Sequence, residues 1–142
     1  MEKKLKDILT LLVVVFTSAA IFSFAAEEPA SGKVIAYYFH GNARCPTCYK
    51  LEQYSKEAIE ANFKDELASG KLVFSVVNIE EKGNEHFIND YQLYTKALVV
   101  SLIENGKEMR SKNLTKIWEH VNNKQKFLEY VTSEIQDFLK GS

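Results

Sequence analysis

The sequence of 142 residues is poor in cysteine and proline, with two of each, and has no marked excess of either charge. The formal net charge of −1 gives no electrostatic reason to expect binding to nucleic acid. With two cysteines and three histidines, the chain is short of ligands for a closed zinc site, which usually takes four such side chains. The scarcity of proline and the hydrophobic content of 46% exclude a disordered chain. This length and composition fit one globular domain.

The first 25 residues differ in composition from the remainder. The basic segment MEKKLKD precedes an uncharged, mostly apolar run of 17 residues at 8–24. This layout is typical of a secretory signal peptide, and the small residue Ala25 makes cleavage after it sterically acceptable. The alternative is an uncleaved membrane anchor through residues 8–24, because 17 residues are just enough to cross a bilayer. We expect residues 26–32 to form a tether, and the domain at residues 33–142 to be exported to the periplasm or to the outer face of the cytoplasmic membrane.

The remainder of the chain alternates strand and helix patterns. Runs of branched and aromatic residues predict strands at 33–39, 72–78 and 97–103, and an Asn-Gly turn at 105–106 predicts a return strand beginning near 108. Amphipathic spacing predicts helices at about 48–68, 85–91 and 114–139, the last one broken near 122–124. Helical crossovers favour parallel strands, whereas the hairpin turn favours an antiparallel pair. The sequence therefore predicts an α/β fold of three layers, a central mixed sheet flanked by helices.

Both cysteines lie in the segment GNARCPTCYK at 41–50, directly after the first predicted strand. Cys45 is expected to begin a helix, with Pro46 at a position where a missing N–H costs nothing. Unpaired amides and the positive end of the helix dipole favour a thiolate there and lower its pKa. Arg44, and His40 when it is protonated, could add to this effect. Cys48 is one helical turn further along, so its sulfur can reach Cys45 but should be more enclosed.

Three uses of the cysteine pair remain open from the residues alone. A disulfide would enclose only Pro46 and Thr47, and so short a loop makes a purely stabilising role a poor explanation. The pair could serve thiol-disulfide exchange, or two sulfurs could bind a soft ion such as copper(I) or trivalent arsenic. In the third alternative, the chain is an electron-carrying or structural subunit that acts only together with a companion enzyme. We predict no cofactor and no resident metal, and we predict protein thiols, protein disulfides or a redox partner protein as partners.

Taken together, these features resemble the thioredoxin-like superfamily over about Val34 to Leu139. The segment VVNIEEKGNEHFINDYQL at 76–93 is similar to the part of thioredoxin that ends a strand, passes an acidic turn and enters a short helix. This resemblance implies a thiol-disulfide oxidoreductase. Cys45 would attack a disulfide and Cys48 would resolve the mixed disulfide, with Pro46 and Thr47 setting the redox potential.

Three shorter segments resemble a narrower family. YFHGNARCPTCYKLE, VVNIEEKGN and NLTKIWE are similar to a bacterial thioredoxin-like family described as a nitrophenyl-compound nitroreductase subunit linked to arsenic-resistance genes. The chain shows no flavin-binding pattern, so any nitro-reducing chemistry would reside in a partner protein.

The chain departs from the thioredoxin pattern at two places. Thioredoxins carry a cis-proline before the third strand, where it shapes the substrate groove, but the corresponding position here is Lys96 or Ala97. Arg44 replaces an aromatic residue before the first cysteine, which suggests a surface for an anion or a partner protein, or a solvated side chain. Glu52 is interpreted as part of a solvated helix face.

Overall fold

The structure of the protein is a computed structural model that describes residues 32–142. The predicted signal or anchor segment at 1–25 lies outside the described residues, as does all of the predicted tether except Gly32. Within the described part of the chain, no helix is long and apolar enough to cross a membrane.

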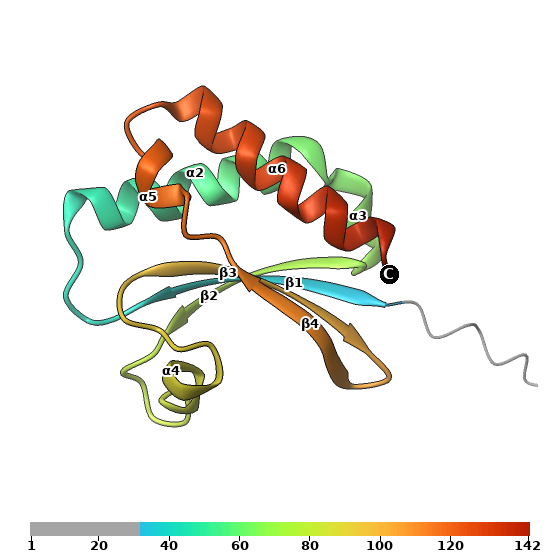
Figure 1. Cartoon of the computed structure of the whole chain (residues 1–142), viewed down its shortest axis with the longest axis horizontal. Helices are drawn as coiled ribbons and strands as arrows, with labels where there is room; N and C mark the ends of the chain where they lie inside the picture. Colours follow the sequence, from blue (N-terminus) through green and yellow to red (C-terminus); the bar gives the residue numbers. More distant parts are fainter. Residues whose placement is uncertain (1–31) are drawn as a thin grey trace, which may run out of the picture.

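Four strands of the described region form one mixed sheet (Figure 1). They are β1 (Lys33–His40), β2 (Leu72–Asn78), β3 (Ala97–Glu104) and β4 (Lys107–Asn113), and their order across the sheet is β2-β1-β3-β4. β1 and β2 are parallel because a helical crossover joins them, and β3 is antiparallel to both β1 and β4. This arrangement confirms the α/β fold with a mixed sheet.

Helices cover both faces of the sheet (Figure 1). The helices on one face are α2 (Pro46–Asn62), α3 (Lys64–Ser69), α5 (Ile117–His120) and α6 (Lys124–Lys140), whereas α4 (His86–Asp90) lies on the opposite face. The predicted break in the C-terminal helical region is present between α5 and α6.

The prediction of one helix over 48–68 is wrong, because two helices occupy this region. Phe63 separates α2 from α3 and has φ −131° and ψ 43°, outside the helical region. Its side chain is 2% exposed and joins the main core. Burial of this aromatic ring therefore overrides the local helical pattern.

Side chains that alternate along β1 supply two separate cores. Val34, Ala36 and Tyr38 face α2 and α6 and belong to the larger cluster. Phe39 faces the other way and packs with Leu93, Ala97 and Val99 in a smaller cluster that also contacts α4 residues. This period of two is expected for a strand buried on both faces. Burial on both faces is consistent with the place of β1 between β2 and β3 in the sheet.

The carboxyl end of β1 determines where the cysteine segment lies. β1 begins beside the C-terminus of the chain, and a Cβ on Gly32 would lie 3.0 Å from the Cα of Ser142. β1 then crosses the sheet and enters the loop that leads to α2 at the opposite end of the molecule (Figure 1).

Candidate functional site

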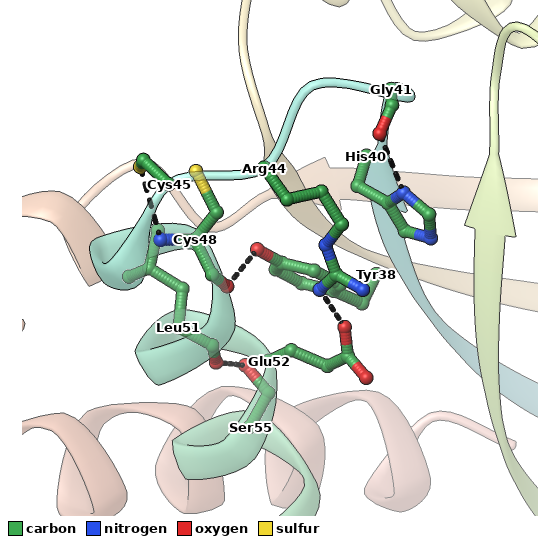
Figure 2. Close-up of polar contacts among 9 residues, drawn as sticks. All are labelled: Tyr38, His40, Gly41, Arg44, Cys45, Cys48, Leu51, Glu52 and Ser55. Carbon is green, nitrogen blue, oxygen red and sulfur yellow. Dashed lines mark hydrogen bonds and ion pairs between the residues drawn. The ribbon is translucent and has the colours of Figure 1, made fainter.

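Cys45 is the N-cap residue of α2 (Figure 2). Its backbone is extended, with φ −93° and ψ 165°, and Pro46 occupies the first turn of the helix. The Cys48 N–H lies 3.3 Å from Cys45 Sγ, so a helix-tip amide donates to this sulfur. The Cys45 carbonyl accepts from the Cys48 and Tyr49 amides, at 2.9 and 3.2 Å, which closes the first turn. The local sequence therefore fixes a sulfur at the positive end of the helix.

The two thiols differ in accessibility. Both are free, but Cys45 is exposed and Cys48 is only 1% exposed. Hydrogen bonding to the Cys48 thiol, followed by the bond from the Cys48 amide, lowers the pKa of Cys45 below its usual value. Burial opposes ionisation but does not outweigh these bonds. The site therefore presents a reachable thiol that favours ionisation, with a second sulfur one helical turn away.

A buried tyrosine lies beneath the motif. Tyr38 is fully buried on β1, and its hydroxyl donates to the Cys48 carbonyl oxygen at 2.6 Å (Figure 2). Burial raises the pKa of Tyr38, so this phenol remains a neutral donor. The bond connects the first turn of α2 to the central strand of the sheet.

Arg44 is largely enclosed rather than solvated. Its guanidinium forms an ion pair with Glu52, and the two side chains are 16% and 27% exposed. The guanidinium carbon also lies 4.2 Å from the centroid of the Tyr49 ring. Figure 2 shows the Arg44 side chain directed toward Glu52 and away from the Cys45 sulfur. None of the causes that lower the pKa of Cys45 comes from Arg44.

Glu52 is therefore a site residue that the sequence analysis missed, since a fully solvated helix face was expected there. A usable signal was its spacing: Glu52 is four residues from Cys48 and eight from Arg44, which places it on the motif's own side of α2.

His40 lies on the other side of Arg44 from the cysteines (Figure 2). Its Nδ1 is 2.9 Å from the Gly41 carbonyl oxygen, and it lines a surface cavity of about 180 Å³. Within the predicted set, the structure thus brings Cys45, Cys48, Pro46 and Thr47 together in one turn and leaves His40 outside it.

Lys96 and Ala97 occupy the junction that leads into β3. Ala97 is 3% exposed and pairs with Phe39 across the sheet. The Lys96 carbonyl oxygen accepts a hydrogen bond from Trp118 Nε1 at 3.1 Å, and Lys96 lines the same cavity as His40. Residues 32–142 contain no cis peptide bond. The backbone at this junction is therefore held by an indole side chain from α5.

The described residues offer no cluster of three or more His, Cys, Asp or Glu side chains that could hold a metal ion. The Cys45 and Cys48 sulfurs are a pair of ligands of the type that soft ions prefer.

Comparisons with solved structures find distant similarity to this chain. No family model matches the chain, and no curated protein matches it. The chain is 21% identical to Fasciola hepatica thioredoxin, with 66% of this chain and 82% of that chain covered and a TM-score of 0.40. For oxidised thioredoxin O2 from Arabidopsis thaliana, the identity is 12%, the coverage 68% and 76%, and the TM-score 0.39. For a structure described as a malarial protein, the identity is 15%, 61% of this chain and 94% of that chain are covered, and the TM-score is 0.37.

Similarity this weak carries no argument about activity. The fold class is established by the chain's own strand order, its parallel crossover and its helices on both faces of the sheet. The chain thus has the thioredoxin-like fold, with a Cys-x-x-Cys pair at the start of the first long helix. The narrower resemblance to a nitroreductase-linked family stays a prediction.

Proposed function

We propose that the protein is a thiol-disulfide oxidoreductase of the cell envelope that uses Cys45 and Cys48 as its redox pair. The observation that carries this proposal is the contrast between the two sulfurs, because Cys45 is exposed at the tip of α2 and Cys48 is buried beside it.

The chemistry follows from this contrast. The Cys45 thiolate attacks one sulfur of a substrate disulfide, forming a mixed disulfide and releasing one substrate thiolate. The Cys48 thiolate then attacks Cys45 Sγ and releases the second substrate thiolate. The substrate gains two electrons, and the protein is left with a Cys45–Cys48 disulfide. A dithiol on a redox partner protein must reduce that disulfide before the next cycle, and the reverse sequence oxidises a substrate dithiol.

The location and the partner are also proposed. The basic and apolar composition of residues 1–25 supports export, which would place the thiols where oxidation is common. The three segments similar to the nitroreductase-linked family suggest that the redox partner is a protein that carries its own cofactor.

The experiment compares Cys45→Ser, Cys48→Ser and the unchanged protein in a disulfide-reduction assay with insulin and dithiothreitol. We expect Cys45→Ser to lose turnover, and we expect Cys48→Ser to accumulate mixed disulfides that can be identified by mass spectrometry. The matched control is Ser55→Ala, which removes a buried hydroxyl on α2 that donates to the Leu51 carbonyl oxygen. Stoichiometric arsenite binding by the reduced pair without disulfide turnover would instead indicate a thiol-binding module.

A further inference from the structure

We propose that Arg44 and Glu52 form a clamp that positions Cys45 at the tip of α2. Arg44 then acts on the reactive thiol through its ion pair with Glu52, and not through its own positive charge. This inference rests on the proposed function, because it concerns the same thiol.

The loop between β1 and α2 is attached to the sheet in its first half. The Asn42 amide donates to Glu80 Oε2 at 2.9 Å, and Asn78 Nδ2 donates to Asn42 Oδ1 at 2.8 Å. Gly41 packs so closely against Glu80 that a Cβ there would lie 2.7 Å from Oε1. These contacts fix residues 41 and 42 to the carboxyl end of β2.

Arg44 attaches the second half of the loop to α2. The ion pair joins residues eight positions apart, so it connects the loop residue before the motif to a helical position beyond it. Both partners are mostly enclosed, at 16% and 27% exposure, and the guanidinium lies over the Tyr49 ring. An enclosed pair that also packs on an aromatic ring holds its geometry better than a solvated pair does. Cys48 and Pro46 lie between its two ends.

The clamp acts on the residue that follows Arg44. Cys45 can accept from the Cys48 amide only while its backbone stays extended at the N-cap position. Without the Arg44 ion pair, the Cys45 backbone could move. The Cys45 sulfur would then lose its hydrogen bond from the Cys48 amide and its position at the positive end of the helix. The Glu52 carboxylate also neutralises the guanidinium, so the pair as a whole contributes little field at the thiol. The other titratable groups in contact with the motif or with Arg44 are Cys48, Tyr38 and Tyr49. His40 lies on the other side of Arg44.

These two mechanisms make opposite predictions for one variant. If Arg44 acted by its charge, Glu52→Gln would free that charge and lower the pKa of Cys45, whereas Arg44→Gln would raise it. If the pair is a clamp, both variants raise the pKa. We therefore expect each variant to slow alkylation of Cys45 at neutral pH by about threefold, equivalent to roughly half a pKa unit.

The measurement is the pH profile of iodoacetamide alkylation of the reduced full-length protein, with the modified cysteine identified by mass spectrometry. The double variant should resemble either single variant, because the second change removes an interaction that is already lost. The matched controls are Lys56→Gln and Glu60→Gln, which break an exposed ion pair of 3.7 Å on the same helix and should leave the profile unchanged.

A lower pKa in Glu52→Gln, or an unchanged pKa in both variants, would overturn the clamp. If an amide variant fails to fold in circular dichroism, Arg44→Lys decides the question, since it keeps the charge but loses the planar guanidinium. A raised pKa in that variant supports the clamp, and an unchanged pKa overturns it. Failure of the proposed function is seen separately, as absence of disulfide turnover by the unchanged protein.

Discussion

Cys45 and Cys48 are three positions apart in the chain, yet their surroundings differ because one caps the helix and the other faces the core. The first turn of α2 aims a backbone amide at Cys45, and the same turn carries Cys48 under the loop. The asymmetry that disulfide exchange requires is thus a property of one helical turn.

Replacing Cys48 should raise the pKa of Cys45 by an amount that depends on the replacement. Cys48→Ala removes the thiol that contributes most to the lowered pKa of Cys45 but keeps the backbone amide, so we expect a partial rise in that pKa. Cys48→Ser retains a donor, and its effect should be smaller. The alkylation profile of Cys45 measures both effects. A larger shift in the serine variant would show that the thiol has another role.

At the scale of single residues, the sequence was enough to predict features set by neighbouring residues. It was not enough to predict contacts between side chains that are far apart in the chain. The N-cap position of Cys45 could be predicted, because a strand run ends before it and proline follows it. The partner of Arg44 could not, since Glu52 looks like any acidic residue on an amphipathic helix until the loop is seen to fold back on it.

A capping residue marks the start of helix α6. Asn123 is its N-cap, and Asn123 Oδ1 accepts from the Lys126 amide at 3.1 Å. The sequence predicted a break near 122–124, and the structure shows that this cap begins α6. The sequence did not predict the break at Phe63, where tertiary burial decides.

Asn123→Ala should therefore lower the free energy of unfolding by about 1 kcal/mol, because one helix-tip amide loses its acceptor. The neighbouring variant Asn122→Ala lacks this cap contact and serves as the control. Urea denaturation of both variants measures the difference. Equal midpoints would show that water replaces the cap at no cost.

A carboxylate joins β4 to the segment after α4. Glu108 accepts hydrogen bonds of 2.6 Å from both Tyr91 and Ser101. Burial disfavours the charged form, but the bonds from Ser101 and Tyr91 outweigh it and lower the pKa of Glu108 below its usual value. The hairpin and α4 are therefore connected through an ionised acid.

The sign of the pH effect follows from the lowered pKa. Glu108 contributes its stability above its unfolded pKa of about 4.3, and that contribution is lost as the pH falls through the folded pKa. Glu108→Gln should thus be less stable than the unchanged protein at pH 7, and the two urea midpoints should converge in acid. Glu104→Gln, in the same hairpin, is the control for loss of charge. A constant difference at all pH values would contradict this account.

At the scale of the whole molecule, the central sheet separates two cores of unequal size. The larger lies under α2 and α6, and the smaller lies under α4 and includes an aromatic group around Phe39. Sequence patterning predicted a sheet flanked by helices from the alternation of strands with helical crossovers. It could not assign single helices to faces, since that depends on the handedness and length of each connection.

Removing one aromatic ring from each core should lower the free energy of unfolding more in the larger core than in the smaller one. Phe127 is fully buried in the larger core, and Phe127→Ala should cost about 3–5 kcal/mol, a large part of the total stability of a domain. Phe87 is half-buried over the smaller core, and Phe87→Ala should cost about 1–2 kcal/mol. Urea titrations of both variants test the order. A reversed order would mean that the α4 side dominates the fold.

Gly32 meets Ser142 at one end of the sheet, and β1 runs from there for eight residues, about 26 Å, toward the loop that presents Cys45. A tag, bead or surface linked at either of these two residues would therefore lie at the end of the sheet opposite the loop that leads to α2 (Figure 1). Immobilisation at either residue should therefore leave the alkylation rate of Cys45 unchanged.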